Sequence, residues 1–410
     1  MTVGQETSSR PANTSDKQLV DASIYRLRLQ DILTVCVLAL LAFGLLMVQS
    51  ASTSVTADPK FQWSPLGWKD LTFVGLSIPT FFIVGRFNYE WFARQRESLA
   101  KSPVFWVFVL SAGACALVLV PHIGSSVNGA RRWLKMGPVQ IQPSELAKWA
   151  AVLFLAYWLT RPKASLDRFF ADFLPTLAPV GLLSLLVVIQ DFGTAALIML
   201  CALTMMLASR VKIRHIVVIA LPVLAAAGWF ILHKEYRVRR ITAFLHPWDN
   251  PQGEGYHMIQ SLLCFSTGGV FGKGLGNGIQ KLGYLPEDTT DFIFAVISEE
   301  LGLFGALLTV ALYMGILYVA WQAVRQKKDD FGRMLAFGIG AMIGLQAAIN
   351  IAVATVSVPT KGLSLPLISA GGSGLIITCS ALGLLYSVCR RMGYEEQPLT
   401  DQKNLAASAV

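Results

Sequence analysis

The chain has 410 residues, of which 54% are hydrophobic and only 14% are charged. Because a soluble globular protein has about 25% charged residues, this composition excludes an ordinary soluble fold and predicts a polytopic membrane protein. A net charge of +9 would suggest nucleic-acid binding in a soluble protein, but here we attribute it to basic cytoplasmic loops and expect no nucleic-acid partner.

We predict an all-α fold in three parts. Residues 1–30 are too polar for a cleavable signal peptide and are interpreted as a cytoplasmic tail. Residues 31–391 form the transmembrane domain, and residues 392–410 form a second cytoplasmic tail. Apolar runs that approach the length of a membrane span recur about ten times. They are Ile32–Val48, Leu71–Val84, Val104–Val120, Leu146–Leu159, Phe173–Val188, Ala195–Leu207, His215–Leu232, Phe292–Val324, Met334–Val358 and Gly374–Val388.

Basic residues gather in both tails and in every second loop, for example between Arg86 and Lys101 and between Arg325 and Arg333. Because cytoplasmic loops carry an excess of Lys and Arg, both termini are predicted to be cytoplasmic. The long loop between the seventh and eighth runs, His233 to Asp291, then lies on the outer side. Such a loop is usually functional or folded onto the protein, and its segment Tyr256 to Phe271 could form a helix on the membrane surface.

The third loop, Pro121 to Ser144, lies on the predicted outer side and contains the adjacent residues Arg131 and Arg132. Arginine can bind phosphate oxygens through two hydrogen bonds, so the pair suggests an anionic ligand; the alternative is contact with lipid headgroups. Glu145 and Lys148 begin the next run on one helix face. They could form a structural salt bridge or position other groups, since ionisable residues in a span generally face a cavity or a partner.

Three further residues on the predicted outer side are candidates for substrate binding. Asp191 lies in a very short turn and could cap the following helix. The ninth loop joins the predicted runs Met334–Val358 and Gly374–Val388, and Lys361 is its one cation. Ser369 begins a stretch of small residues that ends at Gly374 and would allow close approach of a ligand or of another helix.

The cysteines, histidines and glycines indicate no metal or nucleotide site. The six cysteines form no CxxC pair, so we interpret them as small core residues, and the scattered histidines give no zinc signature. The glycine-rich segment Gly268 to Gly278 lacks the spacing of a nucleotide-binding loop and is predicted to be a tight turn.

Asp291 joins a polar loop to the apolar run Phe292–Val324, which we predict to be one tilted or extended helix. Its carboxylate could be a helix N-cap or a catalytic base. Together with the cations of the other outer loops, it adjoins lipid at one side of the membrane. That arrangement suits a reaction on a lipid-linked phosphorylated substrate better than ion conduction, which would favour charged residues in mid-span.

Four segments, considered together, resemble the hallmark motifs of the SEDS family (shape, elongation, division and sporulation). They are NGARRWL at 128–134, QPSELAK at 142–148, YLPEDTTDFIFAVISEELG at 284–302 and PTKGLSLPLISAGGSG at 359–374. The resemblance runs from about Ile32 to Arg391. The GARRWL and PTKGL sequences are more similar to the division-type branch of the family than to the elongation-type branch.

The resemblance implies a ten-helix, inverting peptidoglycan glycosyltransferase that polymerises lipid II at the outer face of the cytoplasmic (inner) membrane. It matches Asp291 to the catalytic aspartate. It matches Glu145 and Lys148 to a helix pair close to that aspartate, and Arg132 and Lys361 to basic positions implicated in function. A class B penicillin-binding protein is the implied partner, together with other division proteins. A divalent cation such as Mg²⁺ or Mn²⁺ could assist, although the sequence shows no dedicated site for one.

Four residues depart from the family pattern. Thr289 stands in place of His, Ala370 in place of Tyr and Gly374 in place of Ser, and Gln190 stands in place of Pro in the turn before Asp191. Two other functions are compatible with a bundle of this kind. One is a lipid II flippase, and the other is a scaffold that recruits division proteins without catalysing a reaction. A flippase is expected to have polar or broken segments that reach mid-membrane from both leaflets.

Overall fold

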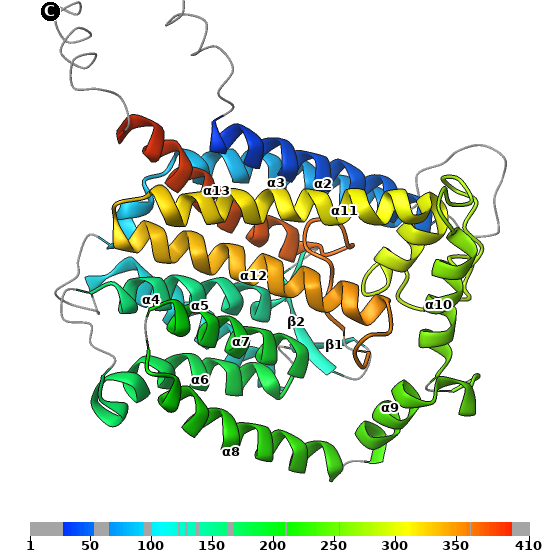
Figure 1. Cartoon of the computed structure of the whole chain (residues 1–410), viewed down its shortest axis with the longest axis horizontal. Coiled ribbons are helices and arrows are strands. Elements are labelled where there is room, and N and C mark those ends of the chain that lie inside the picture. Colours follow the sequence, from blue (N-terminus) through cyan, green and yellow to red (C-terminus); the bar gives the residue numbers. More distant parts are fainter. Residues whose placement is uncertain are drawn as a thin grey trace, which may run out of the picture.

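The computed structural model of the protein is a bundle of long helices (Figure 1). It describes residues 28–52, 65–93, 101–121, 124–127, 130–136, 139–161, 167–209, 211–233, 235–253, 255–360 and 362–395. The two predicted tails lie almost entirely outside these ranges. The last helix continues to Glu395, so it extends slightly beyond the predicted end of the transmembrane domain at Arg391.

The helices are α2 (Leu29–Ala51), α3 (Pro65–Arg86), α4 (Pro103–Leu119), α5 (Pro143–Leu159), α6 (Leu174–Val188), α7 (Phe192–Ala208), α8 (Ile213–Leu232), α9 (Glu235–Leu245), α10 (Tyr256–Gly268), α11 (Ile293–Gln326), α12 (Asp330–Ala354) and α13 (Ser373–Glu395). Short helical turns are η1 (Tyr89–Ala93), η3 (Phe169–Phe173) and η4 (Pro247–Asp249). Each predicted apolar run falls on one of the long helices, so the prediction of a mostly helical protein is confirmed.

Within the described residues, five helices are long and apolar enough to cross a membrane. They are α2, α11, α12, α13 and the helix that η3 and α6 form together. Shorter apolar helices are α4, α7 and the first part of α8. These lengths and compositions support a multi-pass membrane protein.

Helix α5 lies in the interior of the bundle. Every residue from Ala147 to Tyr157 is buried, as expected for a helix that is apolar on all sides. Its neighbours are α4, α7 and α12, whereas α3 and α13 pack closely together and α11 lies against α2 and α12 (Figure 1).

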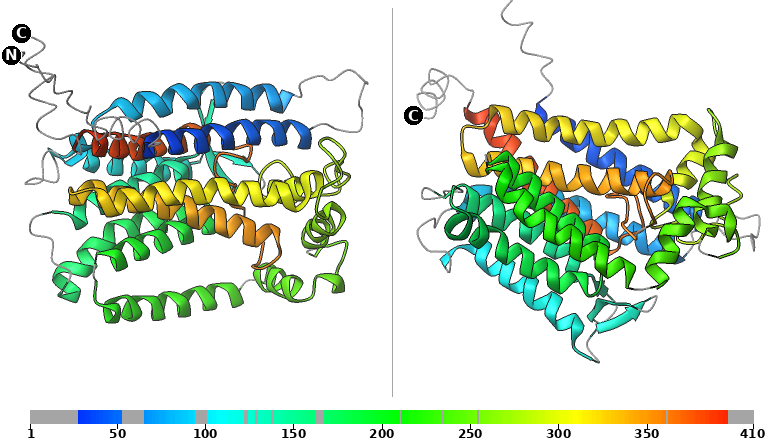
Figure 2. Two further views of the ribbon diagram at one scale, coloured as in Figure 1. Left: turned by 45° about the horizontal axis from the view of Figure 1, so that its top comes forward. Right: turned by 60° about the horizontal axis from the view of Figure 1, so that its bottom comes forward.

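Three short strands follow α4, which the all-α prediction did not include. They are β1 (Gly124–Val127), β2 (Ala130–Met136) and β3 (Val139–Ile141), paired antiparallel in that order. Val127 pairs with Ala130, and the intervening Asn128-Gly129 is a sequence typical of a two-residue hairpin. The sheet contacts α4 and α5 (Figure 2), so it holds the predicted outer loop against the bundle.

The long loop after α8 folds back onto the protein. Its helix α10 lies within the predicted segment Tyr256–Phe271 and runs across one end of the long helices (Figure 1). The rings of Phe265 on α10 and Phe294 on α11 lie 6.0 Å apart. Ser261 Oγ donates to the carbonyl of Ala354 at 2.5 Å, so α10 is fixed to both α11 and α12.

Helix α11 is broken at Gly302, whereas the sequence predicted one continuous helix. Gly302 has φ 65° and ψ −157°, a backbone conformation that favours glycine. The glycine-rich segment fills the break, because Lys273 N donates to Glu299 O at 3.0 Å and Leu303 N donates to Gly269 O at 3.0 Å. Residues 293–301 are therefore a separate short helix that follows Asp291.

Two fully buried glutamates anchor that short helix. Glu299 pairs with Lys273 at 2.7 Å, and Glu300 pairs with Lys281 at 2.7 Å. Ser50 of α2 also donates to the Glu300 carboxylate. A buried charge is tolerated only when it is paired and hydrogen-bonded, and here the partners come from α2 and from the loop between α10 and α11. The start of α11 is consequently a rigid support for the loop that carries Asp291.

Candidate active site

Asp291 lies at the end of the polar loop, directly before α11. Phe292 is the N-cap residue of α11, and no side chain caps the helix, so the alternative in which Asp291 is the helix cap is not found. Among the described residues, none donates a hydrogen bond to the Asp291 carboxylate. A Cβ placed on Gly362 would lie 3.1 Å from Asp291 Oδ2. The absence of a side chain at Gly362 therefore lets the ninth loop pass close to the carboxylate.

The surroundings of Asp291 favour its neutral form. The pKa of this carboxyl is raised from 3.8 to about 7. Burial is the largest cause, the carboxylates of Glu287 and Asp191 also raise the pKa, and the Arg132 guanidinium lowers it. Glu287 has a positive φ of 58° and accepts a hydrogen bond from Thr290 Oγ1 at 2.7 Å. A carboxyl with a pKa near the operating pH is suited to general-base catalysis.

Asp191 caps helix α7, as the sequence suggested. Its Oδ1 accepts from Thr194 N at 3.1 Å and its Oδ2 accepts from Thr194 Oγ1 at 2.8 Å. The side chain is buried and both oxygens are engaged. Asp191 therefore contributes negative charge near Asp291 but is not itself placed to accept a substrate proton.

Arg132 connects the sheet to the turn before α7. It lies on β2, and its Nε donates to Gln190 O at 2.9 Å. Gln190 Nε2 in turn donates to Cys115 O at 3.0 Å, which ties the turn to α4. These bonds keep a guanidinium within electrostatic reach of Asp291. Arg131 is also on β2, but its side chain lies outside the described part of the structure.

Glu145 and Lys148 form the predicted salt bridge, at 2.9 Å. Lys148 is completely buried and also donates to Gln346 Oε1 at 2.7 Å. Gln346 Nε2 donates to Ser364 O at 2.8 Å. The pair is therefore linked through α12 to the ninth loop, which confirms the salt bridge, while a positioning role stays a prediction.

Ser369 holds the ninth loop against the loop of Asp291. Its hydroxyl donates to Thr290 O at 2.5 Å and accepts from Leu365 N at 2.8 Å. Ala370 N donates to Thr289 O at 2.9 Å. Because these backbone groups occupy the hydroxyl, Ser369 acts between the two loops and is not placed as a substrate ligand. Lys361, next to Gly362, lies outside the described residues.

Asn350 of α12 is a site residue that the sequence analysis missed. Its Nδ2 donates to Asp291 O at 2.9 Å and to Leu363 O at 2.6 Å. One signal was available: Gln346 and Asn350 are amide residues one helical turn apart within an apolar run. Polar residues in such a run usually have a specific partner.

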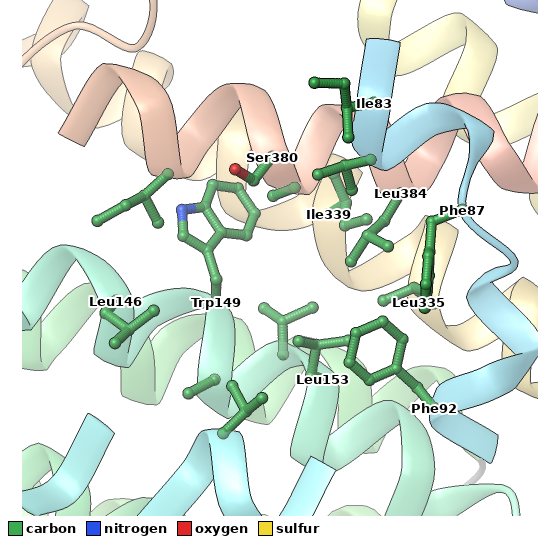
Figure 3. Close-up of a pocket in the computed structure, with 16 residues that line it drawn as sticks. Ile83, Phe87, Phe92, Leu146, Trp149, Leu153, Leu335, Ile339, Ser380 and Leu384 are labelled. Carbon is green, nitrogen blue, oxygen red and sulfur yellow. The ribbon is translucent and has the colours of Figure 1, made fainter. Parts of the chain in front are cut away.

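A separate, apolar cavity of about 320 Å³ lies between α3, α4, α5, α12 and α13. Figure 3 shows the ring of Trp149, from α5, extending towards Ser380 of α13. Apart from Ser380 its lining is apolar, and Ser380 Oγ donates to Ile376 O. The cavity has no group for proton transfer, so it is not a candidate for the catalytic site.

Three comparisons place this chain among known proteins. A family model for FtsW, RodA and SpoVE, described as cell cycle protein, matches residues 30–393. A protein of Nitrosococcus halophilus, named probable peptidoglycan glycosyltransferase FtsW, is 40% identical over 85% of this chain and 89% of its own length. The stage V sporulation protein E of Bacillus subtilis is 38% identical over 88% of this chain and 97% of its own length.

A similar solved structure comes from work on the structural coordination of polymerization and crosslinking by a peptidoglycan synthase complex. That chain is 28% identical, with a TM-score of 0.69 over 88% of this chain and 97% of its own length.

Proposed function

This chain belongs to the family of cell cycle proteins that includes FtsW, RodA and SpoVE, and from that membership we propose that it is a peptidoglycan glycosyltransferase. It polymerises lipid II into glycan strands for septal synthesis in cell division. The observation that carries the proposal is the Asp291 carboxylate. It lies beside Gly362 with an elevated pKa and an arginine nearby, and no described residue donates to it.

In the proposed reaction the donor is the growing glycan on undecaprenyl diphosphate, and the acceptor is the 4-hydroxyl of the GlcNAc of lipid II. The acceptor oxygen forms a bond to C1 of the donor sugar while Asp291 removes the hydroxyl proton. The bond between C1 and the diphosphate oxygen breaks, and the diphosphate leaves with the electron pair. Attack opposite the leaving group inverts the configuration at C1.

Cationic side chains offset the charge that develops on the diphosphate. Arg132 supports this role because it lies within electrostatic reach of Asp291 and has further donors beyond the Nε used by Gln190. We assign the same role to Arg131 and Lys361 from their sequence positions.

A divalent cation, if one takes part, would be held mainly by the substrate phosphates. Among the described residues, no group of three or more His, Cys, Asp or Glu side chains could hold a metal ion. Mg²⁺ is commonly bound in this way, through substrate phosphates and one or two carboxylates.

The proposed topology has ten spans in the cytoplasmic (inner) membrane, with both termini in the cytoplasm and Asp291 at the outer face. Two observations support it. The predicted even-numbered loops are basic, which favours the cytoplasmic side. The first described residues of α2 and the last of α13 also lie at the same end of the bundle, opposite α10 (Figures 1 and 2).

The proposed partner is a class B penicillin-binding protein that crosslinks the strands this chain makes. Support comes from the similar chain of known structure, which belongs to work on the coordination of polymerization and crosslinking by a peptidoglycan synthase complex. Other division proteins would recruit the pair to the septum.

The test is to reconstitute the chain with its transpeptidase partner in liposomes that contain fluorescent lipid II. We expect polymer from the wild-type chain and none from Asp291→Asn, with both proteins equally folded. Movement of lipid II between leaflets without polymer would instead indicate a flippase. A chain that makes no polymer, yet supports division equally well with Asp291→Asn, would indicate a scaffold.

A further inference from the structure

Asn350 joins the two segments between which the Asp291 carboxylate lies. Its side-chain amide donates to Asp291 O at 2.9 Å and to Leu363 O at 2.6 Å. Both acceptors are backbone carbonyls, so the orientation of the amide is determined. Leu363 directly follows Gly362, the residue that approaches Asp291 Oδ2. One buried side chain therefore sets the separation between the carboxylate and the ninth loop.

A second amide supports this arrangement one helical turn away. Gln346 donates to Ser364 O at 2.8 Å and accepts from Lys148 at 2.7 Å. Residues four apart share a face of a helix, so α12 holds two successive residues of the ninth loop, Leu363 and Ser364, by their carbonyls. The ninth loop is thus fixed to a rigid helix at the point where it passes Asp291.

The bonds to Asp291 use its backbone and leave its carboxylate available. Asn350 binds the carbonyl of Asp291, and Ser369 binds the carbonyl of Thr290. We propose that Asn350 is a positioning residue for catalysis, which fixes the Asp291 carboxylate relative to the ninth loop so that it meets the acceptor hydroxyl. This inference rests on the proposed glycosyltransferase function.

The surroundings of Asn350 distinguish this role from simple packing. The side chain is 1% exposed, and its Oδ1 is buried with no partner among the described residues. A buried acceptor without a partner is unfavourable, so packing alone would favour an apolar side chain here. The two bonds that the amide makes connect only Asp291 and Leu363, which points to the geometry of the site.

The test compares Asn350→Leu with the wild-type chain, each as a complex with the transpeptidase partner, in a lipid II polymerisation assay. Leucine has a similar volume but donates no hydrogen bond. We expect kcat to fall about 100-fold, because a small displacement of a catalytic group can reduce a rate by that factor, while KM for lipid II changes little. We also expect the acid limb of the pH–rate profile to shift to lower pH, since a less constrained carboxylate is better solvated.

Two further variants keep the test decisive. Ser387→Ala removes a hydrogen bond of another buried side chain, from Ser387 Oγ to Phe87 O at 2.6 Å. Neither residue belongs to the loops around Asp291, so this variant should leave kcat and the pH profile unchanged. Asn350→Gln retains the amide but adds a methylene, so it should retain more activity than Asn350→Leu even if it is no more stable. If Asn350→Leu cannot be purified, Asn350→Ala is subject to the same measurements.

The inference is overturned if the leucine or alanine variant has wild-type kcat and an unmoved pH profile. It is also overturned if activity merely follows the fraction of folded protein, with the glutamine variant as inactive as the leucine variant. The proposed function is judged separately, by whether the wild-type chain polymerises lipid II and Asp291→Asn does not.

Discussion

The substitution Asp291→Asn should inactivate the protein and, at neutral to alkaline pH, stabilise it. Asparagine keeps the size of the side chain, so the close approach of Gly362 is preserved. It cannot take up the proton of the acceptor hydroxyl, however. A positioned general base contributes about 10²- to 10⁴-fold to a rate. We therefore expect kcat to fall by at least about 100-fold, with little change in KM.

The expected gain in stability follows from the environment of the carboxyl. Its pKa is raised from 3.8 to about 7, mainly by burial. At 1.36 kcal/mol for each tenfold change in proton affinity, the carboxylate form is disfavoured in the folded protein by about 4 kcal/mol. The penalty is absent below about pH 4, grows as the pH rises towards 7 and is complete above it. The stability difference between Asp291→Asn and the wild type should follow the same course.

The assay is polymerisation of fluorescent lipid II by the purified complex between about pH 5.5 and about 8.5, with thermal unfolding measured in parallel. Wild-type activity should rise with pH through about 7, because the base must be deprotonated. Asp288 is a matched control, since burial raises its pKa to about 6 and it is only three residues away. Asp288→Asn should retain polymerisation and the same acid limb. The reasoning is refuted if Asp291→Asn is fully active. It is also refuted if Asp288→Asn polymerises lipid II without the acid limb of the wild-type pH profile.

Arg132→Gln should raise the pKa of Asp291 and move the acid limb to higher pH, whereas Arg132→Lys should move it less; unchanged profiles would remove Arg132 from the site. Lys148→Met should lower the free energy of unfolding by about 3–5 kcal/mol, because it leaves Glu145 without its buried partner. The double variant that adds Glu145→Gln should recover part of that loss, as measured by thermal unfolding. Ser369→Ala should reduce kcat about tenfold through loss of the bond to the loop, with substrate affinity retained, whereas a large rise in KM would favour direct substrate contact. Gly302→Ala should prevent recovery of folded protein, because its φ of 65° and its contacts with the glycine-rich segment leave no room for Cβ.

The helices were predictable because their signal is local. Apolar runs of near-span length identify a membrane helix without any knowledge of its neighbours, and each predicted run falls on a helix of the structure. The same holds for two side-chain interactions. Asp191 caps the helix that it precedes, and Glu145 pairs with Lys148 three residues later.

The features that sequence reasoning missed depend on contacts between distant segments. The break at Gly302 forms because the glycine-rich segment, about thirty residues earlier, supplies hydrogen bonds across it. The three strands are short and lie between apolar runs, so they give little periodicity of their own.

Asp291 itself shows how far local reasoning extends. Its place between a polar loop and an apolar run made it a candidate base, the resemblance to the SEDS family matched it to the catalytic aspartate, and that role stays a prediction. Of its two possible roles, the helix cap is not found in the structure, because the helix begins after Phe292. Asn350 could not have been connected with it, because the two residues are 59 positions apart and only the fold brings them together.

The most direct measurement of the central claim is a structure of the complex with an unreactive lipid-linked acceptor bound. We predict that a carboxylate oxygen of Asp291 lies within about 3.2 Å of the acceptor 4-hydroxyl, with the Arg132 guanidinium towards the diphosphate. An acceptor hydroxyl that faces away from Asp291, with another group at hydrogen-bond distance, would contradict the account.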